Sequence, residues 1–201
     1  MTRYPAGVFR ALQRIVASVD GVVVALAMTT LGFALDWRYG TSAQTWGLIG
    51  FSWVLVWLAA IDRITRLLPD VLTLPLLWLG LIAQLHPATR TVGAELAIGG
   101  AVLGYLPLRA LELAWFNLRG VEALGFGDLK LLAAIGAWLG PQAAMLVLVG
   151  GALAGSTWHL ITPASVRARL GQSFPLGPWL VGAALALMLA GPAWMGWTGA
   201  D

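Results

Sequence analysis

The sequence contains no cysteine and few charges. The absence of Cys from all 201 residues excludes disulfide frameworks, thiol nucleophiles and cysteine-based zinc or iron–sulfur sites. Charged residues make up 10% of the chain and hydrophobic residues 59%, whereas about 25% of an ordinary soluble domain is charged. These proportions exclude an ordinary soluble domain. No basic run predicts a nucleic-acid partner, and the two histidines, His86 and His159, have no metal-ligand spacing. We expect neither a metal nor a cofactor.

What the chain does contain is a series of apolar runs separated by polar breaks. There are seven, at residues 21–35, 45–61, 71–85, 92–116, 129–139, 143–161 and 179–197. None alternates with the period of two of a barrel strand, and a spanning backbone must satisfy its own hydrogen bonds, so helices are expected. The fifth run is short and ends at Gly140-Pro141, a pair that breaks helices. The sequence thus predicts one all-α polytopic membrane domain over residues 1–201, with about seven transmembrane helices.

Basic residues are divided unequally between the two sets of loops that these helices would create. With a cytoplasmic N-terminus, nine lie inside, namely Arg3, Arg10, Arg14, Arg63, Arg66, Arg119, Lys130, Arg167 and Arg169. Only Arg38 and Arg90 would lie outside. Because cytoplasmic loops carry the excess of Lys and Arg, we expect the N-terminus and the loops at 62–70 and 117–128 to face the cytoplasm.

The first 18 residues differ from the runs that follow. Apolar side chains recur there at helical spacing with arginines between them, a pattern typical of an interfacial amphipathic helix. The sequence therefore predicts such a helix over 1–18 and a helical bundle over 19–201. A cleavable signal peptide is the alternative, but residues 34–37 lack its small-x-small cleavage pattern.

Carboxylates at or inside a membrane span are costly and usually have a purpose. Most of the nine acids have a simple explanation at the edge of a run or at the terminus, including Asp20, Asp36, Glu95 and Asp201. Glu112 follows Arg109 at a spacing of three residues, which favours charge neutralisation on one helix face.

Asp62 and Asp128 are harder to explain in this way. Asp62 ends the second run and Asp128 begins the fifth, both on the expected cytoplasmic face. If they meet, like charges resist double ionisation and the pair holds a single proton. Such a pair suits peptide hydrolysis, in which the ionised member activates a water and the protonated member polarises the scissile carbonyl.

Two glycines, Gly125 and Gly127, flank Phe126 just before Asp128. Without a Cβ they allow an extended substrate to approach the backbone beside Asp128. The alternative is that this G-x-G-D segment is only a capping turn with Asp128 at the N-cap position.

Longer stretches around both aspartates resemble the active-site motifs of bacterial type IV prepilin peptidases. Residues 61–81, IDRITRLLPDVLTLPLLWLGL, resemble the first motif, and residues 125–134, GFGDLKLLAA, with GAWLG at 136–140, resemble the second. Residues 174–178, FPLGP, are similar to a family segment P-[FY]-G-P, with Leu176 in place of the aromatic residue. The similarity extends from about residue 35 to residue 191.

This resemblance implies a G-x-G-D membrane aspartic protease. It would remove the basic leader of prepilins or pseudopilins on the cytoplasmic side of the inner membrane. The family's catalytic aspartates map onto Asp62 and Asp128, and the remaining motif positions are Gly125, Gly127, Lys130, Pro69 and Asp70. Lys130 would either reduce the charge cost of the dyad or anchor its helix at the lipid headgroups. The candidates for substrate binding are Asp70, Glu122 and Phe126.

The sequence also departs from the longer family members. Those carry a further N-terminal span with a G-S-F-L-N-V-type motif and a cytoplasmic domain with paired C-x-x-C zinc ligands, and this sequence shows neither. We therefore expect a short form. Because that region is associated in the family with N-methylation, the resemblance supports cleavage but not methyl transfer.

Two other functions remain open. A small proton-coupled transporter would place carboxylates deep in its spans and repeat a pair of broken helices, and no such repeat is visible. A catalytically silent assembly factor is disfavoured by the intact motifs.

Overall fold

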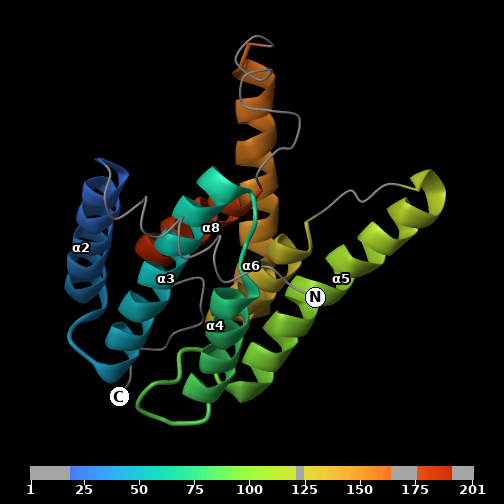
Figure 1. Cartoon of the computed structure of the whole chain (residues 1–201). Coiled ribbons are helices and arrows are strands. Elements are labelled where there is room, and N and C mark those ends of the chain that lie inside the picture. Colours follow the sequence, from blue (N-terminus) through green and yellow to red (C-terminus); the bar gives the residue numbers. More distant parts are fainter. Residues whose placement is uncertain (1–18, 121–124, 164–175, 192–201) are drawn as a thin grey trace.

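The computed structural model of the chain describes residues 19–120, 125–163 and 176–191, and all regular structure in these ranges is helical. The helices are α2 (Val19–Tyr39), α3 (Ala43–Thr65), α4 (Asp70–Ala83), α5 (Ala94–Arg119), α6 (Phe126–Ile161) and α8 (Gly177–Ala190) (Figure 1). The prediction of an all-α bundle is confirmed. The expected interfacial helix over residues 1–18 lies outside the described residues.

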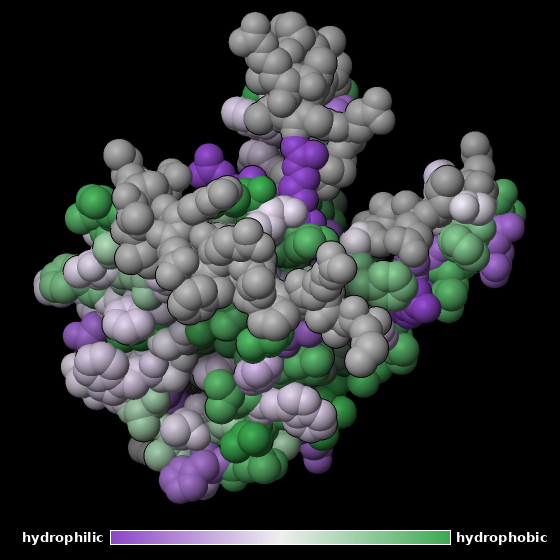
Figure 2. Space-filling model, in the orientation of Figure 1, coloured by the Kyte–Doolittle hydropathy of each residue, from purple (hydrophilic) through white to green (hydrophobic). Residues whose placement is uncertain are grey.

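Hydrophobic side chains lie on the outside of this bundle as well as in its core. Trp37, Leu118 and Leu160 each expose more than three quarters of their surface. In Figure 2, hydrophobic residues (green) lie among less hydrophobic ones on the part of the face not covered by grey atoms. By length and composition, four of the described helices can cross a membrane, namely α2, α3, α5 and α6, while α4 and α8 are shorter apolar helices. An apolar exterior of this kind is expected where lipid replaces water around a polytopic protein.

The break expected at Gly140-Pro141 is present inside α6. Gly140 has φ 85° and ψ 176°, a conformation that favours glycine. Before the break, Gly136 packs on Gly100 of α5, whereas after it Gly151 packs on Leu180, in the first turn of α8. The Asp128 side chain, in the first half of α6, also lies beside the start of α8, at Gly177. If α6 were unbroken, however, Gly151 would lie about 35 Å from Asp128 at a rise of 1.5 Å per residue. The chain therefore turns back at Gly140, and each of the seven apolar runs corresponds to a helical segment.

One predicted boundary was wrong. The last run was expected to continue from 179 to 197, but α8 begins at Gly177 and ends at Ala190. Gly191 follows with φ 106°, a backbone conformation that ends the helix. Hydropathy extends beyond this point in the sequence because apolar residues continue through Trp194 and Trp197, which lie outside the described residues.

Close packing fixes the first half of α6 against its neighbours. Neither Gly100 nor Gly136 has room for a Cβ beside the other's carbonyl, so α5 and α6 meet backbone to backbone, as small residues allow in membranes. The Trp138 indole stacks on Phe51 of α3, with ring centroids 4.9 Å apart, and donates a hydrogen bond of 2.9 Å to the Leu76 carbonyl of α4. Trp138 thereby sets the depth of α6 relative to α3 and α4.

The connections fall at two ends of the bundle. At one end Tyr39 donates to the Met188 carbonyl at 2.6 Å and Arg38 donates to the Ala190 carbonyl at 2.9 Å, so the ends of α2 and α8 lie together. At the opposite end, which we call the dyad end, the end of α3 meets the starts of α6 and α8 at Asp62, Asp128 and Gly177. The loops around 62–70 and 117–128 were expected on the same face, and their described residues share the dyad end.

Candidate active site

Asp62 lies in the last turn of α3 and points inward. Arg66 ends the helix in the left-handed conformation, φ 54°, and its N–H donates to the Asp62 carbonyl at 2.8 Å. The side chain of Asp62 is buried, with 5% of the residue exposed. In the described part of the chain, its Oδ2 is buried and has no hydrogen-bond partner. Because a buried carboxylate oxygen without a partner is costly, this arrangement indicates a functional rather than a stabilising group.

Asp128 lies in the first turn of α6. Gly125 is the N-cap residue and accepts a hydrogen bond of 3.0 Å from the Asp128 N–H. The alternative interpretation of Asp128 as an N-cap residue is therefore wrong, because Asp128 is the third residue of the helix. A carboxylate in this position is stabilised by the positive end of the helix dipole.

The two carboxylates meet at Gly177, the first residue of α8. A Cβ placed on Gly177 would lie 2.6 Å from Oδ2 of Asp62 and 3.4 Å from Oδ1 of Asp128. The two oxygens therefore lie no farther apart than the sum of these distances, about 6 Å. This separation allows both carboxylates to contact one small group between them, such as a water molecule. Only glycine leaves that space free.

Gly177 was not among the residues expected at the site. It belongs to the segment FPLGP at 174–178, whose resemblance to a family motif was the one available signal. Composition and spacing cannot indicate it, because its position depends on how α8 packs against α3 and α6. Phe174 and Pro175 of the same segment lie outside the described residues.

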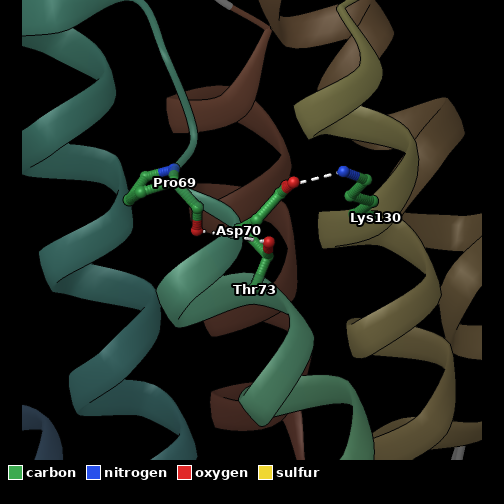
Figure 3. A network of polar contacts seen from close by, with 4 residues as sticks. All are labelled: Pro69, Asp70, Thr73 and Lys130. Carbon is green, nitrogen blue, oxygen red and sulfur yellow. Dashed lines mark hydrogen bonds and ion pairs between the residues drawn. The ribbon is translucent and has the colours of Figure 1, made fainter. Parts of the chain in front are cut away.

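A salt bridge joins the two motif stretches beside the dyad. Lys130 Nζ lies 2.6 Å from Asp70 Oδ1, and Figure 3 shows the Asp70 side chain of α4 extending toward Lys130 of α6. Pro69, the N-cap of α4, accepts from Thr73 Oγ1 at 3.3 Å. Lys130 thus has Asp70 as its ionic partner, so it ties the first turn of α4 to the second turn of α6.

The remaining motif residues surround Asp128. A Cβ on Gly127 would lie 2.7 Å from the Leu68 Cβ, so the loop after α3 packs directly on the turn before Asp128. Phe126 is 40% exposed, and the Arg109 guanidinium carbon lies 4.7 Å from the centroid of its ring. Glu122 lies outside the described residues. Among residues 19–120, 125–163 and 176–191, no three His, Asp or Glu side chains form a group that could hold a metal ion.

Comparison with known proteins gives a consistent family match. Residues 49–160 match the model of the type IV leader peptidase family, a region that includes both aspartates. The chain is 43% identical to a prepilin leader peptidase/N-methyltransferase of Dickeya chrysanthemi, over 79% of this chain and 62% of the relative. A protein of the same name from Pseudomonas aeruginosa is 37% identical, over 84% and 58%, and one from Aeromonas salmonicida is 37% identical, over 97% and 60%. The chain thus spans roughly three fifths of the length of these curated relatives. No solved structure matches it.

The convergence of the two aspartates can be tested without any assay of activity. Because the chain has no cysteine, Asp62→Cys with Asp128→Cys introduces a single thiol pair. We expect a short bifunctional thiol reagent to bridge this pair in membranes, with the linked peptides identified by mass spectrometry. Asp62→Cys with Glu95→Cys is the matched control, because Glu95 is exposed in the first turn of α5 at the opposite end of the bundle. Equal bridging of both pairs, or none of either, would contradict the geometry.

Proposed function

Because the chain belongs to the type IV leader peptidase family, we propose that it is a membrane aspartic endopeptidase. Its substrates would be prepilins or pseudopilins, from which it removes the basic leader. Asp62 and Asp128 would be the catalytic dyad. The observation that carries this proposal is the convergence of the two carboxylates on Gly177.

The dyad would act on a water molecule held between the carboxyl groups. Two carboxylates at this separation share one proton. The ionised member takes a proton from the water as its oxygen attacks the scissile carbonyl carbon, and the protonated member donates to the carbonyl oxygen. When the C–N bond breaks, the protonated carboxyl gives its proton to the leaving amine. The ionised carboxylate takes a hydroxyl proton from the tetrahedral intermediate as the carbonyl re-forms, so the dyad again holds one proton. No covalent intermediate forms.

Gly125, at the start of the turn that carries Asp128, would provide a place for the peptide. Gly125 is exposed, so an extended segment can approach the backbone there, whereas the space beside Gly127 is filled by Leu68. Cleavage also needs the scissile carbonyl to be held close to the activated water in the right orientation. The position of the dyad at helix ends, rather than in mid-span, suits a substrate whose leader lies outside the bilayer.

We further propose that the dyad end faces the cytoplasm and that the membrane is the bacterial inner membrane. The support is the distribution of basic residues along the sequence, by which nine would lie on the cytoplasmic side and two on the other. Arg63, Arg66 and Lys130 all lie near the dyad end. This orientation gives the dyad access to a leader made and retained on the cytoplasmic side.

The alternatives receive less support. A proton-coupled transporter would need carboxylates deep in its spans, whereas Asp62 and Asp128 lie at helix ends. An assembly factor without activity gives no reason to retain a buried Asp62 oxygen for which the described residues offer no hydrogen-bond partner. The relatives' names include N-methyltransferase, whereas the paired carboxylates of this chain suit peptide cleavage.

Loss of either carboxylate tests the proposed chemistry. We expect Asp62→Asn and Asp128→Asn each to lower the rate of leader cleavage by about 10²–10⁴-fold, the usual contribution of a positioned acid or base. The assay is co-expression with a prepilin, with cleavage followed by a shift on a gel. Glu95→Gln, which changes an exposed carboxylate at the opposite end, is the control and should cleave normally. Processing that survives both dyad substitutions would rule out this dyad.

Asp70 and Glu122 are also proposed to attract the basic leader, because acidic loops raise the local concentration of a basic ligand. Asp70 already pairs with Lys130, so a test must distinguish attraction of the leader from the structural salt bridge. We expect Asp70→Asn to raise KM several-fold at low salt, with a smaller effect at high salt. Lys130→Gln, which frees the same carboxylate, should not raise KM. Equal rises in KM for both variants would show that only the salt bridge matters.

A further inference from the structure

The described part of α5 carries a charge pair that the dyad chemistry does not use. Glu112 is 3% exposed, and its carboxylate contacts the Arg109 guanidinium one turn away. A carboxylate buried in an apolar helix needs a compensating charge, which accounts for the presence of an arginine. Neutralisation alone does not require the guanidinium to contact any other element.

The guanidinium nevertheless contacts the start of α6. Its central carbon lies 4.7 Å from the centroid of the Phe126 ring, within the range of a cation–π interaction. Phe126 belongs to the segment 125–128, Gly-Phe-Gly-Asp, which we call the GFGD turn. Arg109 is therefore held by Glu112 on its own helix and contacts the turn that carries Asp128.

The GFGD turn contributes few side chains of its own that could hold it in place. Gly125 and Gly127 contribute none, and the N-cap of α6 makes no side-chain hydrogen bond. On one side, Gly127 packs on Leu68 of the loop after α3. The contact from α5 is made through Phe126 and Arg109. A turn built from two glycines is easily displaced, and a small displacement of a catalytic group reduces the rate strongly.

We infer that Arg109 is a positioning residue, held by Glu112, that stacks on Phe126 and fixes the GFGD turn so that Asp128 meets Asp62. This inference deepens the proposed function and rests on it for its effect on cleavage. It also changes the role expected for Phe126, whose ring serves to anchor the turn rather than primarily to contact the substrate.

The test removes the pair without leaving a buried charge. In Arg109→Leu/Glu112→Leu, both charges are replaced by apolar side chains, a change that buried ion pairs often tolerate, so thermal stability in detergent should be retained. We expect kcat to fall about tenfold with KM little changed. The reversed pair, Arg109→Glu/Glu112→Arg, keeps the neutralisation but moves the guanidinium along α5 by about 4.5 Å. It should lose activity to the same extent.

Combining these substitutions with one at Phe126 distinguishes a positioning role of Arg109 from a merely structural role. Phe126→Leu should lower kcat by a similar factor, and adding Arg109→Leu/Glu112→Leu to it should cause no further loss, because both changes remove the same contact. If the double-leucine protein does not fold, Phe126→Leu and Arg109→Lys still test the contact. Phe126→Leu should lose activity, whereas Arg109→Lys, which keeps a cation over the ring, should retain most of it. Additive losses, or a double-leucine protein with the wild-type kcat, would overturn the inference.

A second readout does not depend on the enzyme's activity. The yield of the thiol bridge between Asp62→Cys and Asp128→Cys should fall several-fold when Arg109→Leu/Glu112→Leu is added. The matched control is Arg38→Leu, at the opposite end of the bundle, which should leave the yield unchanged. If the yield falls but no prepilin is cleaved by the wild-type protein, the positioning role holds and the proposed function fails. An unchanged yield would contradict the positioning role whatever the activity.

Discussion

Two acidic side chains from distant parts of the chain lie together at one end of the bundle, where they must not be forced apart by their charges. This requirement governs the dyad end of the bundle. The end of α3, the start of α6 and the start of α8 converge there, and each reaches the site by a helix terminus rather than a mid-span position. A terminus gives Asp128 the favourable field of the helix dipole, and the residue opposite the pair is a glycine. The helix terminus therefore lowers the cost of the Asp128 carboxylate, and the glycine leaves space for a small group beside both carboxylates.

The remainder of the bundle determines how precisely the two carboxylates are aligned. The reversal at Gly140 returns the chain to the dyad end, so that α8 can follow with Gly177 beside Asp62. Trp138 fixes the depth of α6 through its hydrogen bond to α4 and its stacking on α3. The Gly100–Gly136 contact allows α5 to lie close enough to α6 for Arg109 to contact Phe126. Packing far from the dyad thus determines the position of Asp128.

Several of these features follow from the sequence because they depend on local chemistry. The helices are encoded by apolar runs, the reversal by Gly140-Pro141, and the shared face of the two aspartates by the order of the spans. The site itself was indicated by Asp62 and Asp128, which are costly in an apolar chain. Their catalytic role remains a prediction.

Other features depend on tertiary contacts that no spacing reveals. The position of Gly177 between the carboxylates requires knowledge of how α8 crosses α3. Arg109 was interpreted only as the partner of Glu112, because the i, i+3 spacing predicts that contact. The spacing gives no information about the contact with Phe126, which lies on another helix. The boundary of α8 at Gly191 was missed because hydropathy continues past a backbone conformation that ends the helix.

The central claim is that Asp62 and Asp128 act together in the space beside Gly177. Gly177→Ala tests it most directly, because the added Cβ would displace the end of the Asp62 side chain and need not move the backbone. Gly182→Ala, which adds the same atom to α8 with nothing within 4 Å, is the matched comparison. In a leader-cleavage assay on both folded proteins, the account predicts at least a hundredfold lower rate for Gly177→Ala and a normal rate for Gly182→Ala. Equal rates for the two variants would contradict it.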